Sequence, residues 1–165
     1  MFDNQLIIQG KYAELLKKYS RDKQGEKIIF SVTNNLGEPK EIFIFDNYLQ
    51  GYMVSAMIGI INRKSLPDDG NRTSEAKIFA DILAKKRGDL DTLIQFMLLT
   101  NEEDSANKRV RNAFTIDKEN GDQLEKQLTS YARGGLTIID EWFNKCATYE
   151  DVANQMILFL QSLRS

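Results

Sequence analysis

The apolar residues of this chain recur mostly at intervals of three and four positions. Such intervals place side chains on one face of an α-helix, and they extend through most of the 165 residues. They predict a mainly α fold: a compact single domain over residues 1–165, built as a bundle of about six helices. Residues 27–45 depart from the pattern because β-branched and aromatic residues are frequent there, so a short β-hairpin and a helical turn both fit this segment.

The longest apolar run, residues 43–61, predicts a buried helix with Asp46 as its N-cap. Polar residues interrupt the run, and a membrane span needs about 20 mostly apolar residues, so the run does not predict a membrane helix. Pro67 lies in the polar segment that follows, and proline cannot continue a helix. A helix nearer the N-terminus is predicted from the stripe Tyr12, Leu15, Leu16 and Tyr19.

Two further helices are predicted in the middle of the chain. Thr73 or Ser74 begins the first, Gly88 breaks it, and Asp89 caps the second. A short amphipathic helix with exposed basic residues is then predicted around Val110.

The C-terminal third of the chain predicts one long helix and one shorter final helix. Asp122 with Glu125 resembles a capping box, in which two side chains satisfy free backbone N–H groups at a helix start, and the long helix continues to about Lys145. Thr148 is the predicted cap of the final helix. The apolar stripe of that helix is Val152, Met156, Phe159, Leu160 and Leu163.

Two adjacent glycines, Gly134 and Gly135, lie inside the predicted long helix, where each costs about 0.5–1 kcal/mol relative to alanine. A phosphate-binding loop would need a new helix start after them, but the apolar stripe passes through Gly135 without a change of phase. We therefore predict that Gly135, and Gly59 in the earlier apolar helix, are positions of close packing. The stripe consists of Leu124, Leu128, Tyr131, Gly135, Ile138, Ile139 and Trp142.

The charge balance and the histidine and cysteine content limit the kinds of site that this chain can form. The 22 basic and 24 acidic residues give a net charge of −2, which provides no global attraction to nucleic acid or to an anionic membrane. The chain has no histidine, and this excludes histidine-based zinc sites, general bases and nucleophile triads. Cys146 is the only cysteine, so no intramolecular disulfide can form. We expect a cytoplasmic protein without a cofactor or a bound metal.

Acidic residues offer two candidate sites. Asp22 with Glu38 and Lys40 fits the residue order of a metal-dependent nuclease, but Pro39 disfavours the strand that such a site needs, and a solvated loop is favoured instead. The remaining carboxylate groups fit solvated charge runs better than an acid–base pair in a cleft. They are Asp68, Asp69, Glu102, Glu103 and Asp104.

Basic residues gather in local clusters, although the chain is nearly neutral. Phosphate contacts need such cations along one surface, whereas ordinary helix surfaces also carry cations that complement the helix dipole. The second interpretation is favoured. The candidate nucleic-acid-binding residues are Arg63, Lys64, Lys108, Arg109, Arg111 and Arg133.

Two blocks of sequence, IFIFDNYLQGYMVSAMIGIINRKSLP and YARGGLTIIDEWF, stand on either side of IFADILAKKRGDLDTLIQFML. In this order they resemble small accessory proteins of bacterial phage-defence islands, typified by those beside DNA-phosphorothioation restriction genes. The resemblance covers residues 43–143. It implies a non-enzymatic subunit that acts with larger ATPase or nuclease partners, and it assigns no catalytic residues.

Three expectations about function follow. The favoured one is an accessory or adaptor subunit of a defence or DNA-modification system, which acts through contacts with other proteins and also with DNA. A stand-alone nucleic-acid-binding module and a small metal-dependent nuclease are the alternatives. Self-association is a further expectation, because several helices are apolar enough to bury two faces.

Overall fold

The chain adopts a mainly α fold, as the apolar spacing predicts. The computed structural model describes residues 2–22, 24, 28–116 and 120–162, and within these ranges it contains seven helices and four short strands. The helices are α1 (Gly10–Tyr19), α2 (Tyr48–Ile61), α3 (Ala80–Lys85), α4 (Arg87–Leu99), α5 (Ala106–Phe114), α6 (Gly121–Phe143) and α7 (Tyr149–Ser162). The strands are β1 (Leu6–Gln9), β2 (Ser31–Thr33), β3 (Pro39–Glu41) and β4 (Glu75–Ile78).

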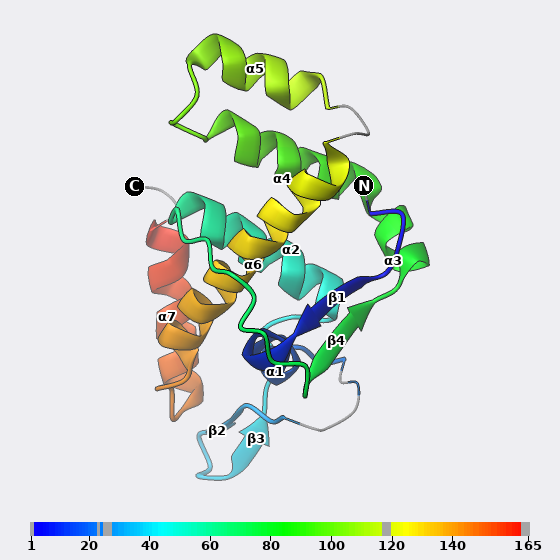
Figure 1. Ribbon diagram of the computed structural model, residues 1–165. Helices are drawn as coiled ribbons and strands as arrows, with labels where there is room; N and C mark the ends of the chain where they lie inside the picture. The colour runs from blue at the N-terminus through cyan, green and yellow to red at the C-terminus, as the bar shows by residue number, and fades with distance from the viewer. Residues whose placement is uncertain (1, 23, 25–27, 117–119, 163–165) are drawn as a thin grey trace.

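The helices α2 and α6 cross in the middle of the molecule (Figure 1). Their backbones approach each other through a reciprocal pair of glycines. A Cβ atom on Gly135 of α6 would overlap the carbonyl oxygen of Ser55 in α2, and one on Gly59 of α2 would overlap the carbonyl oxygen of Tyr131 in α6. In each helix the two residues are four positions apart, so they lie on one side of it. Only glycine fits at either position without moving the partner helix.

Residues 62–74 form an extended connection, here called the strap, which runs from α2 across α6 towards β4 (Figure 1). A Cβ atom on Gly134 would overlap the carbonyl oxygen of Lys64 in the strap. The backbone N–H of Leu66 donates to the carbonyl oxygen of Ser130 in α6 at 3.0 Å. The two adjacent glycines of α6 therefore allow close contact with two different backbone segments: Gly135 with α2 and Gly134 with the strap.

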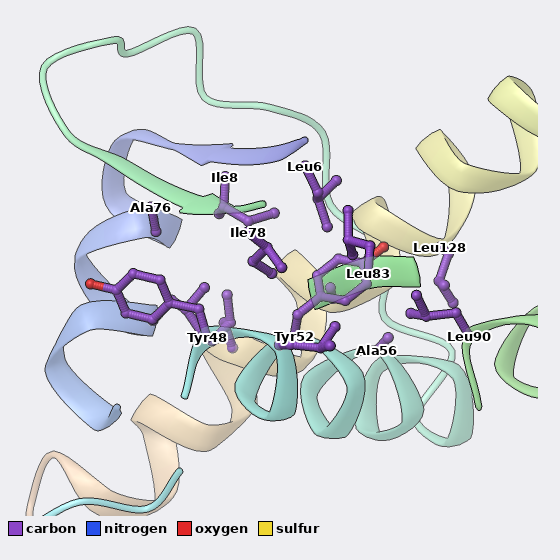
Figure 2. Packing of buried hydrophobic residues seen from close by; sticks show 14 of the residues in the cluster. Leu6, Ile8, Tyr48, Tyr52, Ala56, Ala76, Ile78, Leu83, Leu90 and Leu128 are labelled. Carbon is purple, nitrogen blue, oxygen red and sulfur yellow. The ribbon is translucent and has the colours of Figure 1, made fainter. Parts of the chain in front are cut away.

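The main hydrophobic core lies between α2, α6 and a two-stranded sheet. Strands β1 and β4 pair antiparallel, with Leu6 opposite Ile78 and Ile8 opposite Ala76, and all four side chains are buried. Figure 2 shows Tyr52 of α2 pointing towards this sheet. Because α2 carries no charged residue, it can turn apolar side chains towards the sheet and towards α6 at once.

A polar network joins α1 to α6 beside a second, smaller core. The Tyr19 hydroxyl donates to Oδ1 of Asp140 at 2.6 Å, and Lys18 Nζ donates to the same oxygen at 2.7 Å. The Tyr19 ring is fully buried and meets Phe30 edge-on, with 5.2 Å between ring centroids. Burial and then the Asp140 carboxylate raise the pKa of Tyr19 well above its usual value, so the phenol remains a neutral donor.

The segment before α4 differs from the sequence prediction. Residues 75–78 form strand β4 and not the start of a helix, because Ala76 and Ile78 alternate with half-buried residues and pair with β1. Helix α3 begins only at Ala80. Gly88 does not break a helix: it lies in the first turn of α4, with open space where a Cβ atom would be.

Three predicted helix caps are wrong. Asp89 does not cap α4, because it lies in the first turn of that helix and the N-cap is Lys86. The N-cap of α2 is Asn47, whose side chain accepts from the backbone N–H of Gln50 at 2.9 Å, and the predicted cap Asp46 precedes it by one residue. The predicted capping box of α6 is not formed, because the Glu125 carboxylate accepts the backbone N–H of Phe2 at 2.8 Å instead.

The predicted cap of α7 is confirmed. The Thr148 hydroxyl accepts the backbone N–H of Asp151 at 3.1 Å, and the Asp151 carboxylate accepts the backbone N–H of Thr148 at 2.9 Å. This reciprocal pair is a capping box. In the apolar stripe predicted for α7, Val152 and Phe159 are half-buried, whereas Met156 and Leu160 are exposed. Leu163 lies outside the described residues.

Within residues 27–45, where the sequence fits both a hairpin and a helical turn, the structure has a short hairpin. Strands β2 and β3 pair antiparallel with Ser31 opposite Glu41, and Ile42 adds one backbone hydrogen bond to Phe30 at 3.0 Å. The paired residues, 31–33 and 39–41, lie in the middle of the segment 27–45 for which the sequence allowed a hairpin.

We predict that Gly135→Ala destabilises the fold by about 1–3 kcal/mol, because α2 and α6 must separate to admit the methyl group. The matched control is Gly88→Ala, which adds the same group to a helix where nothing lies within 4 Å. This control should be neutral or stabilising by up to about 1 kcal/mol, as helix propensity requires. Urea unfolding of the two variants measures the difference, and equal free energies of unfolding would contradict the close approach.

Candidate functional site

The outer side of α2 forms one wall of an apolar groove. Met53, Val54 and Met57 lie on this side and are only half-buried, and Ile61 at the helix end is 46% exposed. A helix that is apolar on all sides is usually covered on all sides. Here the sheet and α6 cover part of α2, and a strip of apolar surface remains open.

The opposite wall comes from α3 and α4. Two adjoining hollows of about 460 and 300 Å³ lie between this wall and α2, and they share Met53, Val54 and Asp89. They therefore form one continuous groove, which we call the α2–α4 groove. Its lining residues are Asp46, Asn47, Leu49, Gln50, Met53, Val54, Met57, Ile82, Lys85, Lys86, Asp89, Thr92 and Leu93.

The α2 wall of the α2–α4 groove is adaptable as well as apolar. Met53 and Met57 are unbranched and polarizable, and methionine side chains of this kind adjust to partners of different shape. Met53 and Leu93 pack against the main core, whereas Met57 is part of neither hydrophobic core cluster among the described residues. Met57 is therefore available for contact with another molecule.

Charged residues line the hollow nearest the start of α2, and one of them, Asp89, also lines the adjoining hollow. Lys86 pairs with Asp89 at 3.1 Å, and Asp46 pairs with Arg21 at 3.4 Å. Within the parts of the chain that the structure describes, Lys85 forms no ion pair. One positive charge is thus left at this end of an otherwise apolar groove.

The six cations predicted to bind nucleic acid do not form one free basic surface. Four of them pair with carboxylates of the same chain: Arg63 with Glu102, Lys64 with Glu141 at 3.0 Å, Lys108 with Asp104, and Arg133 with Asp68 at 3.8 Å. The other two lie on α5, where Arg109 is half-buried and Arg111 is exposed. Surface pairs of this kind contribute at most about 1 kcal/mol each, but they compete with phosphate for the cation.

A second hollow, of about 540 Å³, lies between β1 and α6 and includes Arg133. Two of its three charged groups, Arg133 and Glu125, already have partners inside the chain, whereas Lys126 forms no ion pair among the described residues. Arg133 is 17% exposed and lies near the Asp68 carboxylate and the Tyr12 ring, and Glu125 accepts the N–H of Phe2. Within the described structure this hollow therefore carries one unpaired lysine, as the α2–α4 groove does, but its lining residues include none of the methionines that make the groove adaptable.

The candidate acidic sites have structural roles. The Asp69 carboxylate accepts the backbone N–H groups of Lys11 and Asn71, which fixes the strap to the start of α1. These two hydrogen bonds lower the pKa of Asp69. Glu38 and Lys40 of the proposed nuclease motif pair with each other at 3.2 Å on the β2–β3 hairpin. No group of three or more metal-ligating side chains occurs among the residues that the structure describes.

Cys146 is half-buried just after α6. Its Sγ contacts the carbonyl oxygen of Trp142 at 3.6 Å, and burial raises the pKa of the thiol. A thiol with a raised pKa is a poor nucleophile near neutral pH.

Comparison with family models, curated proteins and solved structures finds no match to this chain. Within the described ranges, no helix is long and apolar enough to cross a membrane. The interpretation of the site therefore depends on the geometry of the chain itself.

The α2–α4 groove was not predicted from the sequence. The signal that could have indicated it is the composition of residues 48–61, which contain no charged side chain. A helix of this kind needs cover on every side, and a chain of this size has few helices to provide it. Which side stays open depends on the tertiary arrangement.

We predict that Asp69→Asn lowers stability at neutral pH, because the amide accepts the Lys11 N–H less strongly than the carboxylate does. The folded-state pKa of Asp69 is lowered, so its stabilising effect is present above about pH 4 and is lost as the pH falls through the folded-state value. The stability gap between wild type and variant should therefore close in acid. Urea midpoints measured from pH 7 to pH 3 test this, and a gap that stays constant would contradict the assigned role.

Proposed function

We propose that this chain is a non-enzymatic accessory subunit that binds another protein in the α2–α4 groove. The observation that carries the proposal is the continuous apolar groove along α2, with Met53 and Met57 on its α2 wall. Grooves between helices commonly receive the apolar face of a helix from a partner. Burying apolar surface in this way contributes about 25 cal/mol for each Å² removed from water.

The occupant proposed for the groove is an amphipathic helix with an acidic residue at one end. Its apolar face contacts Met53, Met57 and Leu93, and its acidic residue lies opposite Lys85 at the charged end of the groove. Lys85 sets the direction of the bound helix, because only one orientation brings the acidic end to it. Electrostatic complementarity of this kind adds specificity more than affinity.

The resemblance to accessory proteins of phage-defence islands provides the class of partner. In that setting the bound helix belongs to a larger ATPase or nuclease subunit of a defence or DNA-modification system. The absence of histidine from the sequence and the structural use of Asp68, Asp69 and Glu38 support a role in binding over one in catalysis.

Direct binding of nucleic acid has less support. Four of the six candidate cations already pair with carboxylates, and the net charge is −2. Contact with DNA in this proposal is made mainly by the partner protein.

We predict that Met57→Lys abolishes capture of the partner by the tagged full-length chain in its native host, because it places a charge on the apolar α2 wall of the groove. The matched control is Leu36→Lys, which makes the same kind of change at an 82% exposed position on the β2–β3 hairpin. The control should capture the same protein as wild type. Quantitative mass spectrometry of the captured material measures both variants.

A second substitution tests the charged end of the groove. Lys85→Glu should weaken capture several-fold while the free energy of unfolding falls by no more than about 1 kcal/mol, because within the described structure Lys85 has no ion pair to lose and the change removes only a favourable charge from the last turn of α3. If Met57→Lys and Lys85→Glu both capture the partner as strongly as Leu36→Lys does, the partner does not bind in the α2–α4 groove.

A further inference from the structure

Helix α7 carries an exposed apolar seam along one side. Tyr149, Ala153, Met156 and Leu160 follow one another at steps of four, three and four residues, and this spacing places them in one line on a helix. Tyr149 is 40%, Met156 38% and Leu160 55% exposed, and Ala153 is also exposed. Ile157, 52% exposed, widens the seam. The seam contains no charged side chain.

The other side of α7 attaches it to its own chain at the edge of the molecule, next to α6 (Figure 1). Val152 and Phe159 are half-buried, and the Phe159 ring lies 5.0 Å from the Trp142 ring between centroids. No described residue of α7 is fully buried. A helix of 14 residues is marginal in water on its own, so α7 depends on packing and receives it on one side only.

We propose that two copies of this chain associate by antiparallel packing of α7 against α7. The steps of four, three and four are those of the contact seam between paired helices. When one helix is inverted, Tyr149 lies opposite Leu160 of the second copy, and Ala153 lies opposite its Met156. In each of the two central layers the small side chain of Ala153 packs against the large side chain of Met156 from the other copy. Small–large pairs of this kind fill the space between two helices. The seam complements itself, and this favours a second copy as its occupant.

Charge decides between the antiparallel and the parallel orientation. Glu150 and Asp151, both in the first turn, are the charged residues of α7 within its described span. A parallel pair would gather four carboxylates at one end. In an antiparallel pair the two acidic ends are separated by about 21 Å, the length of a 14-residue helix. This exceeds the Debye length of about 8 Å at physiological salt, so the repulsion is screened.

The size of the contact sets its strength. Stable interfaces bury roughly 800 Å² on each partner, and one helix of about 21 Å provides less than this. The dimer is therefore weak and reversible, and it forms as the concentration rises. This inference does not depend on the α2–α4 groove, because the two surfaces share no residue.

Sedimentation equilibrium of the purified full-length chain over a wide concentration range tests the proposal. The average mass should rise from 18.9 kDa towards twice that value. Leu160→Lys should keep the chain monomeric throughout, because the lysine lies in the seam. The matched control is Leu158→Lys: Leu158 is 56% exposed on the same helix but lies away from the seam, so this variant should associate like wild type. Circular dichroism checks that both variants retain their helices.

Disulfide cross-linking tests the orientation. In a Cys146→Ala background, chains with Ala153→Cys are mixed with differently tagged chains with Met156→Cys and oxidised. The antiparallel pair predicts mixed disulfides in excess over Ala153→Cys homodimers. A parallel pair would instead join position 153 to position 153.

Three results would overturn the proposal. They are a wild-type chain that stays monomeric at every concentration, an equal loss of association in Leu158→Lys and Leu160→Lys, and efficient cross-linking by Ala153→Cys alone. Met57→Lys should leave self-association unchanged. A wrong proposal for partner binding in the α2–α4 groove can therefore be distinguished from a wrong proposal for α7 pairing.

Discussion

The close approach of α2 and α6 is the constraint on which the rest of the structure depends. Ser55 and Gly59 of α2 meet Tyr131 and Gly135 of α6 backbone to backbone, with no room for a side chain at either glycine. Helices that pack this closely exclude water along their whole contact and fix each other's rotation. The strap then crosses the same turn of α6 at Gly134, so one short segment of α6 positions two other parts of the chain. The cost of two glycines inside a helix, about 0.5–1 kcal/mol each, is offset by these contacts.

The same constraint explains why apolar surface remains exposed. With its rotation fixed by α6, α2 turns one side to the β1–β4 sheet and leaves Met53 and Met57 facing the gap towards α4. Helix α7 packs on the far part of α6 through Val152 and Phe159, and its other apolar side has no cover in the described structure. Both exposed surfaces have the same cause: α2 and α7 are apolar on more sides than the rest of a chain of this length can cover. Exposed apolar surface of this kind is typical of proteins that bind other proteins.

The sequence predicted the long amphipathic helices better than the short elements. The stripe through Gly135 indicated an unbroken helix, and α6 runs without a break from Gly121 to Phe143. Strands β1 and β4 have four residues each, too few for an alternating pattern to be distinguished from one turn of helix. The identity of the backbone that meets Gly135 and the position of the α2–α4 groove both depend on contacts between segments distant in sequence. No local pattern contains that information.

Nuclear Overhauser effects between backbone protons of α2 and α6 test the central claim most directly. Because glycine has two α-protons and no side chain, those of Gly135 should show strong cross-peaks to the α-proton of Ser55, and those of Gly59 to the α-proton of Tyr131. Both sets should be present in the purified wild-type chain at neutral pH. Their absence, in a chain whose chemical shifts show α2 and α6 intact, would contradict the reciprocal glycine contact and the arrangement built on it.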